Sequence, residues 1–180
     1  MANYDLVIKG GNLVIPNIGV QKADIGIIGE KIAAMAETVP TSNSARVVDA
    51  SGKFVFPGAI DSHFHIGIYR PFEDDATSES TSAASGGVTT ILSYFRTGQS
   101  YLNKMGPYKQ ILPELLELSK HSFLTDYGYH LALFTDEHIS EIEWLVKEGG
   151  VSTLKYYMFY KLLNLAGSSP DALNYLSLIH

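Results

Sequence analysis

Two histidines separated by one residue are the feature of this sequence best suited to chemistry. They stand in PGAIDSHFHIG, residues 57–67, where His63 and His65 flank Phe64. Successive side chains of a β-strand point to opposite faces, so a strand here places both imidazoles on one face and the phenylalanine on the other. Two imidazoles on one face can bind one metal ion, which makes this stretch a candidate metal-binding strand end. The alternative is an ordinary pair of half-exposed strand histidines.

Lys155 is the second candidate for chemistry. It lies within STLKYYMFYK, residues 152–161, in an apolar and aromatic setting that disfavours the charged amine. The alternative is a lysine at a strand end whose stem is buried and whose amine reaches water. A charged lysine beside two histidines would repel a divalent cation, so a role in metal binding requires that its charge be removed.

The first third of the chain reads as short β-strands separated by Gly, Asn and Pro. The expected strands are residues 4–9, 12–15, 23–28, 31–36, 46–49 and 54–56. Residues 10–12 and 29–31 carry hairpin signals between apolar runs. We therefore expect residues 1–56 to form the N-terminal part of a small β-sandwich domain with antiparallel strands.

From residue 57 onward, expected strands alternate with expected helices. The strands are residues 59–65, 88–94, 126–134 and 153–158, and the helices are residues 76–85, 107–121 and 137–148, with a further helix beginning at 169–171. This alternation is typical of a parallel α/β fold, with a TIM-type (β/α)8 barrel as the leading form. Residues 57–180 then supply about the first half of such a barrel.

The barrel prediction brings the two candidates together, because the carboxyl ends of barrel strands converge on one face. His63 and His65 end the first expected strand and Lys155 lies in the fourth. The last residue, His180, falls inside an expected helix, and four strand-helix units are half a barrel. We expect either part of a longer protein or a fragment whose barrel another chain completes.

Composition narrows the class of partner. The 180 residues are 46% hydrophobic and 18% charged, with a net charge of −6 and no cysteine. The acidic balance argues against nucleic acid as a partner, and the absence of cysteine excludes disulfides and thiolate ligands. The first residues lack the pattern of a secretory leader. The sequence contains no apolar run long enough to span a membrane, so a membrane is not an expected partner. The sequence predicts a soluble, cytoplasmic protein.

Four ordered stretches resemble the cyclic amidohydrolases of the amidohydrolase superfamily, most closely the dihydropyrimidinase and D-hydantoinase type. They are PGAIDSHFHIG, the pair Asp74 and Asp75 followed after ten residues by GGVTT, DYGYHLAL at 126–133, and GVSTLKYYMFYK at 150–161. The likeness covers nearly the whole chain. It implies hydrolysis of a cyclic amide, with ring opening of a dihydropyrimidine or hydantoin by a metal-bridging hydroxide.

The resemblance also implies a cofactor that answers the charge problem at Lys155. In that family the lysine is carboxylated by carbon dioxide, and the carbamate bridges two divalent ions, usually zinc. His63 and His65 would hold the more buried ion. Two further histidines and an aspartate of the family's site come from later strands, which lie beyond residue 180. The resemblance also suggests a homo-oligomer, specifically a tetramer.

Aromatic residues near the expected strand ends are candidates for substrate binding. The resemblance makes Tyr160 a group that stabilises the developing oxyanion, although it could equally be one more aromatic in a crowded run. Tyr157, Phe72 and Phe95 are candidates for the walls of a substrate pocket. Loop aromatics are also common without such a role.

The remaining polar residues suggest no chemistry. The run of acidic residues at 73–75 reads as a solvated loop before a helix. His121, His130 and His138 have no spacing that suggests a shared ligand, so we interpret them as ordinary surface or strand histidines, and we interpret His180 as structural.

Other functions stay open. An allantoinase or dihydroorotase relative is possible, but dihydroorotases typically carry an arginine two residues after the second histidine, where this chain has Gly67, with Arg70 nearby but off the pattern. A different class is an inactive fragment or a noncatalytic dihydropyrimidinase-like assembly protein, against which the intact candidate ligands argue.

Overall fold

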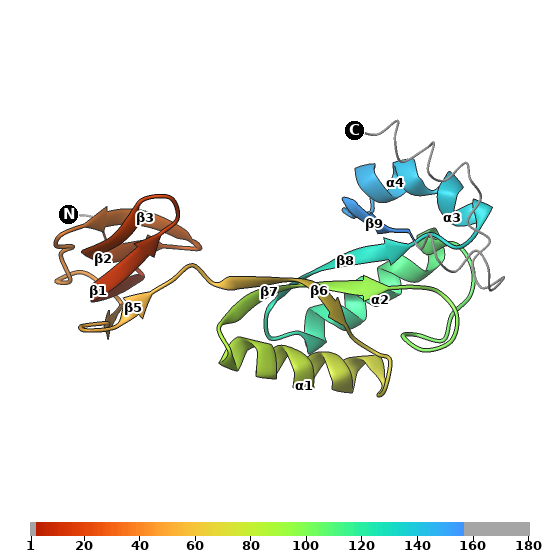
Figure 1. The fold of residues 1–180 in the computed structure, drawn as a ribbon, viewed down its shortest axis with the longest axis horizontal. Helices are drawn as coiled ribbons and strands as arrows, with labels where there is room; N and C mark the ends of the chain where they lie inside the picture. Colours follow the sequence, from red (N-terminus) through yellow and green to blue (C-terminus); the bar gives the residue numbers. More distant parts are fainter. Residues whose placement is uncertain (1–2, 157–180) are drawn as a thin grey trace. The chain divides into compact units, whose positions relative to one another are not determined.

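The computed structural model describes residues 3–156. The chain divides into two compact units, Met1–Pro57 and Gly58–His180 (Figure 1).

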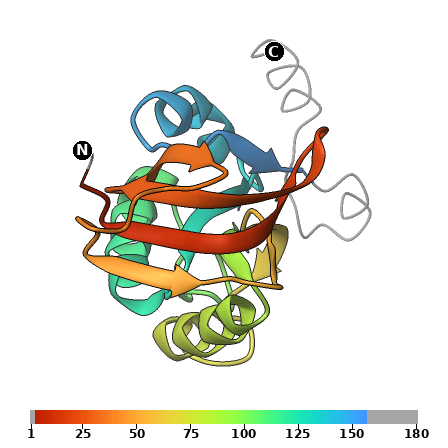
Figure 2. The ribbon, with the colours of Figure 1, turned by 90° about the vertical axis from the view of Figure 1, so that its left-hand side faces the viewer.

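The N-terminal unit is a single mixed β-sheet, which Figure 2 turns toward the viewer. Its strands are β1 (Leu6–Ile15), β2 (Gly19–Ile28), β3 (Lys31–Ala36), β4 (Arg46–Asp49) and β5 (Phe54–Val55). The sheet order is β3-β2-β1-β4, with β5 also paired to β1. Strands β1, β2 and β3 are antiparallel, as expected, but β4 and β5 run parallel to β1. The expected antiparallel pairing therefore holds for β1, β2 and β3 and is wrong for β4 and β5, and a sandwich domain to which this sheet belongs stays a prediction.

One of the two expected hairpins is wrong. Strand β1 continues through residues 10–12, and its pairing with β2 shifts register between Ile8 and Gly11. Gly10 has φ 67°, a conformation that serves a β-bulge as well as a turn. Its N–H donates to Oδ1 of Asp24 on the neighbouring strand at 2.7 Å, which satisfies the group that the bulge removes from the ladder. The hairpin at 29–31 is confirmed, with Gly29 at φ 59° between β2 and β3.

The second unit contains a four-stranded parallel sheet of order β6-β7-β8-β9 (Figure 1). The strands are β6 (Ala59–His65), β7 (Val88–Phe95), β8 (Asp126–Ala132) and β9 (Thr153–Lys155). The helices are α1 (Phe72–Ser85), α2 (Tyr108–Ser122), α3 (Asp136–Ser140) and α4 (Ile142–Lys147). Strands in sequential order with helical connections confirm the α/β class and are consistent with part of a (β/α)8 barrel. A closed barrel stays a prediction.

Two of the expected helices have other bounds in the structure. Helix α1 begins at Phe72, so the acidic residues 73–75 form its first turn instead of a loop. Negative charge there favours the helix N-terminus. The single helix expected at 137–148 is two short ones, α3 and α4, which meet at Glu141. The helix expected from residue 169 and the end of the strand expected to reach residue 158 lie outside the described residues.

The core of the second unit lies between the sheet and helices α1 and α2, which pack on one of its faces (Figure 1). Buried members include Ala76 of α1, Leu112 and Leu115 of α2, and Phe95 and Leu131 of the sheet. Each large apolar side chain buried in this way contributes about 1.5–3 kcal/mol to the free energy of unfolding. None of the helices within residues 3–156 has the length and apolarity needed to span a membrane.

Candidate active site

The predicted metal ligands lie on the sheet face opposite the core of the second unit. Phe64, Tyr129, Leu131 and Leu154 are among the strand residues that belong to the core or pack against it. Because side chains alternate along a strand, their neighbours point to the other face. Those neighbours are His63 and His65 on β6, His130 on β8, and Thr153 and Lys155 on β9. The register aligns His65, Tyr94, His130 and Thr153 in one row across the four strands.

A β-bulge shapes the strand that carries the two histidines. Asp61 pairs with Ile91 of β7, and the next pair is Phe64 with Ser93, so three steps along β6 match two along β7. The irregularity removes the His63 N–H from the ladder, and it donates instead to Oδ1 of Asp61 at 3.1 Å. Bulges of this kind re-aim side chains at the ends of strands.

The two imidazoles lie together, as the spacing predicted. Their ring centroids are 5.0 Å apart and the rings are nearly perpendicular. The His65 ring also lies 5.1 Å from the ring of Tyr94 on β7. Nδ1 of His65 lies 3.2 Å from the hydroxyl of Tyr101, in the loop between β7 and α2. A hydrogen bond at one ring nitrogen fixes the orientation of the imidazole and leaves Nε2 for another partner.

The electrostatics of this face favour a neutral His65. Burial lowers the pKa of His65 below its usual value of 6.5, and the neighbouring His63 and Lys155 lower it further. Because the charge of Lys155 acts on the pKa of His65, the lysine lies near the two histidines. A neutral imidazole is the form that binds a metal ion.

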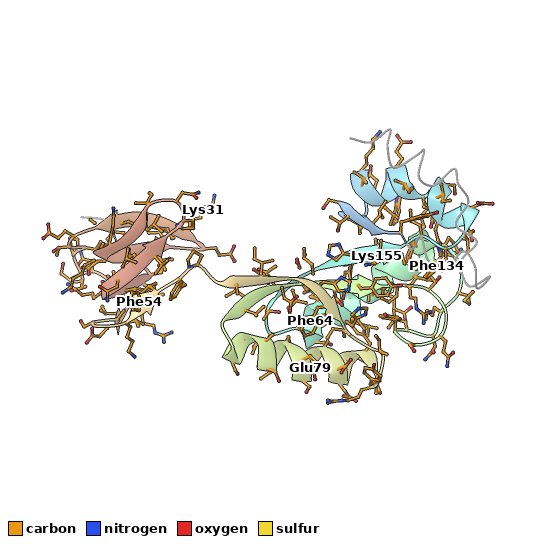
Figure 3. The ribbon with its side chains drawn as sticks, viewed as in Figure 1. Lys31, Phe54, Phe64, Glu79, Phe134 and Lys155 are labelled. Carbon is orange, nitrogen blue, oxygen red and sulfur yellow. The ribbon has the colours of Figure 1, made fainter. Side chains whose placement is uncertain are left out.

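Lys155 ends the short strand β9 (Figure 3). Its carbonyl accepts the N–H of Leu133 at 3.2 Å, so the backbone of β9 is anchored to the segment that follows β8. The side chain is half-buried and shares the face of His63 and His65. This is the position in which a lysine without its positive charge could share metal ions with the histidines.

The described part of the chain supplies only some of the ligands that a metal pair requires. Residues 3–156 contain no group of three or more His, Cys, Asp or Glu side chains that could hold an ion. Two imidazoles on one face, one of them favoured in its neutral form, still fit a divalent ion of the zinc type. The described residues therefore supply two imidazoles to the predicted metal site, which stays a prediction.

The chain is similar in sequence to known proteins over most of its length. The chain is 34% identical over 162 residues to a D-hydantoinase of Geobacillus stearothermophilus, covering 86% of this chain and 32% of that protein. It is 32% identical over 151 residues to an allantoinase of Desulfitobacterium hafniense strain Y51, covering 83% and 32%. A crystal structure of D-hydantoinase matches with a TM-score of 0.76 and 30% identity, over 93% of this chain and 35% of that one. No protein-family model matches the chain.

The chain is a relative of the cyclic amidohydrolases. Its similarity to D-hydantoinases, dihydropyrimidinases and allantoinases extends over most of its length. It spans about a third of the length of these curated relatives.

In this cyclic amidohydrolase relative, the two phenylalanines predicted to line a pocket lie in the core. Phe72 is the first residue of α1 and is 4% exposed, and Phe95 at the end of β7 is 1% exposed. The ring of Phe95 packs 6.5 Å from Tyr108 and 6.2 Å from Tyr129. Both side chains therefore pack in the core of the second unit. Contact of Phe72 or Phe95 with a substrate stays a prediction. Tyr157 and Tyr160 lie outside the described residues.

Two residues that support the site were missed from sequence. Asp75, assigned to a solvated run, is 6% exposed, and its Oδ2 accepts the N–H of Gly67 at 2.7 Å. Tyr101 donates its backbone N–H to the carbonyl of the same glycine at 2.6 Å. An acidic run before a helix does not indicate which of its carboxylates binds a backbone N–H eight residues earlier. Tyr101 stands in an irregular loop, where no periodic pattern indicates a contact.

His138 was also misread as an ordinary surface or strand histidine. Its side chain is 1% exposed, and its Nδ1 accepts the N–H of Phe134 at 3.2 Å. Nε2 then carries the proton and donates to the carbonyl of Gly106 at 3.1 Å. His138 therefore satisfies backbone groups from two segments of the second unit.

A cleft of about 390 Å³ lies elsewhere, within the N-terminal unit. Lys9, Asp24 and Glu37 are among its lining residues. It contains none of the residues to which the sequence assigned chemistry.

Proposed function

We propose that this protein hydrolyses a cyclic amide, opening a dihydropyrimidine or hydantoin ring. The observation that carries the proposal is the common face of His63, His65 and Lys155, at the carboxyl ends of the two outer strands of a parallel sheet. The carboxyl ends of parallel strands are where α/β barrels place their active sites. Similarity to D-hydantoinases and an allantoinase supports the same reaction class.

The proposed roles follow from the chemistry of each group. His63 and His65 would bind one ion through neutral imidazoles, which burial and nearby positive charge favour at His65. The amine of Lys155 would bond to the carbon of carbon dioxide and release a proton, giving a carbamate whose oxygens are metal ligands. When bound, a pair of divalent ions supplies hydroxide near neutral pH and polarises the ring carbonyl. Tyr160 is proposed to donate its hydroxyl to the developing oxyanion.

The loop after β6 favours a hydantoin or a dihydropyrimidine as the substrate. A substrate with a carboxylate would need an arginine at position 67, where this chain has glycine. Gly67 has φ 82°, and a Cβ there would lie 3.1 Å from the Cα of Tyr101. A long side chain at this position would be strained in backbone and packing alike. Arg70 lies near Asp75 and Glu79 of α1, with N to O distances of 3.9 and 3.5 Å.

The test is metal analysis together with ring opening of hydantoin, dihydrouracil and allantoin. We expect the purified protein to hold zinc and to open at least one ring, and we expect Lys155→Met to lose both properties. Lys147→Met is the matched control, since Lys147 is an exposed lysine paired with Glu143 on α4. An active protein without metal and with an unmodified Lys155 would refute the proposed mechanism.

An inactive fragment or noncatalytic assembly protein is the second candidate. It is favoured by the observation that residues 3–156 contain no group of three or more side chains that could hold a metal ion. A purified species of 19.7 kDa without metal would support it. We further propose a homo-oligomer, which the same mass measurement under native conditions tests.

A further inference from the structure

His130 links the strand of the two histidines to the strand of the lysine. It lies on β8, and its Nε2 is 2.8 Å from the carbonyl oxygen of Ser62 on β6. Its Nδ1 is 2.6 Å from Oγ1 of Thr153 on β9. Strands β6 and β8 are not neighbours, because β7 lies between them. The imidazole therefore spans one whole strand of the sheet.

The bulge in β6 explains why a carbonyl is available to this ring. The register shift between Asp61 and Phe64 takes Ser62 out of the regular pairing with β7. A backbone carbonyl outside the ladder requires a donor from elsewhere. Ser62 immediately precedes His63, so a bond to its carbonyl fixes the backbone that carries a predicted metal ligand.

The contact with Ser62 places a proton on Nε2 of His130. The Ser62 carbonyl can only accept, so Nε2 carries the proton. Nδ1 lies 2.6 Å from Oγ1 of Thr153, a hydroxyl that also lies 3.4 Å from the Tyr129 carbonyl. Thr153 lies two residues before Lys155 on the same face of β9. One imidazole ring thus ties the strand end that carries His63 to the one that carries Lys155.

We propose that His130 is a positioning residue that sets the separation of β6 and β9 at the metal-binding face. This inference rests on the proposed function, because the metal pair belongs to that proposal. The hydrogen-bonded bridge itself involves only Ser62, His130 and Thr153. Its role is to hold the ligands of two strands in register for a shared metal pair. Loss of such supporting hydrogen bonds typically lowers metal affinity about 10- to 100-fold.

Four substitutions separate positioning from general packing. His130→Leu removes both hydrogen bonds at similar volume, whereas His130→Gln keeps one donor and one acceptor. Thr153→Val removes the partner on β9, and Thr153→Ser keeps it. His121→Leu is the matched control, because His121 is an exposed histidine on α2 whose Nε2 lies 3.2 Å from Oε1 of Glu117 on the same helix.

The first measurement is nitrogen-15 NMR of the histidine rings in zinc-free protein. We expect the His130 proton on Nε2 in the wild type and in Thr153→Ser, with a changed Nδ1 shift in Thr153→Val. A ring without a proton on Nε2, or a ring insensitive to Thr153→Val, would overturn the bridge. This measurement stands even if the protein binds no zinc, an outcome that would reject the proposed function and with it the positioning role.

The second measurement is the dissociation constant for zinc alone, with unfolding of the zinc-free variants alongside. We expect about tenfold weaker zinc binding in His130→Leu and at most about threefold in His130→Gln and His121→Leu. Equal zinc affinity in the Leu and Gln variants would overturn the proposal. So would a loss of affinity that follows the loss of stability across all variants.

Discussion

The hydroxyl of Tyr101 lies 3.2 Å from Nδ1 of His65, so a loop after β7 contacts an imidazole at the end of β6. The backbone N–H of Tyr101 also donates to the carbonyl of Gly67 at 2.6 Å. The loops that follow two neighbouring strands are thus joined at the predicted metal-binding face.

Replacing Tyr101 by phenylalanine tests the contact with His65. Tyr101→Phe keeps the ring that packs 5.6 Å from both Tyr94 and Phe95 but removes the hydroxyl. We expect about tenfold weaker zinc binding, since the His65 ring loses its orienting partner. The free energy of unfolding should fall by only about 1 kcal/mol. Zinc titration and urea unfolding measure the two effects.

Tyr69→Phe is the control for Tyr101→Phe, because Tyr69 is 92% exposed. Unchanged zinc affinity in Tyr101→Phe would show that the hydroxyl does not orient His65.

Asp75 is predicted to stabilise the loop after β6. Asp75→Ala leaves the buried N–H of Gly67 without its acceptor, which should cost about 1–3 kcal/mol in the free energy of unfolding. Asp75→Asn retains a side-chain oxygen and should lose less. Asp74→Ala is the matched control, since Asp74 is an exposed acid in the same first turn of α1. Equal losses in the two alanine variants would assign the effect to helix charge alone.

Glu141 is predicted to fix the start of α2 from the junction of α3 and α4. Its carboxylate, 3% exposed, accepts the N–H groups of Tyr108 and Lys109 at 2.6 and 3.0 Å. Glu141→Ala should lower the free energy of unfolding by about 2–3 kcal/mol, because two charge-assisted hydrogen bonds are lost. Urea unfolding provides the measurement.

The control for Glu141 is Glu143→Ala, two residues further along the chain. Glu143 is exposed and pairs with Lys147 one turn later in α4, so its removal should cost a small fraction of the loss at Glu141. Similar losses at both positions would contradict the capping role.

Asp24 should make the stability of the N-terminal unit depend on acidity. Burial raises the pKa of its carboxyl, but the N–H groups of Val39 and Gly10 and the charge of Lys9 outweigh burial, so the pKa lies below the usual 3.8. Ionised Asp24 therefore stabilises the folded state above about pH 4. That contribution is lost as the pH falls through the lowered pKa.

Asp24→Asn tests the pH dependence. The variant should be less stable than wild type at pH 7, and the difference should shrink as the pH falls below about 4. Thermal unfolding from pH 7 to pH 2.5 measures the difference. A constant difference across this range would rule out the carboxylate as its source.

Local patterns were sufficient for the elements that carry the predicted ligands. The bounds of β6 follow from PGAIDSHFHIG, and the shared face of His63 and His65 follows from the two-residue period of a strand. Alternation of strands and helices was enough to predict a parallel sheet in sequential order. These features depend on neighbours in the chain, so a single sequence contains them.

Local patterns failed where a residue's partner is distant in sequence. The glycines at 10 and 11 satisfied a hairpin pattern, but pairing with Asp24 made them a bulge. The helical run from residue 137 was periodic, but Glu141 interrupts it while binding the start of α2, 33 residues away. Propensity alone cannot anticipate such competition from tertiary contacts.

The sequence by itself determined which groups could do chemistry here: two imidazoles on one strand face, a lysine on a later strand, and no thiol. Tertiary structure alone decided what supports them, namely Tyr101 at His65, Asp75 at Gly67, and His130 between Ser62 and Thr153. The reason is physical. Residue type and period fix the direction of a side chain, whereas hydrogen bonds across 8 to 68 residues exist only after strand register and loop path are set.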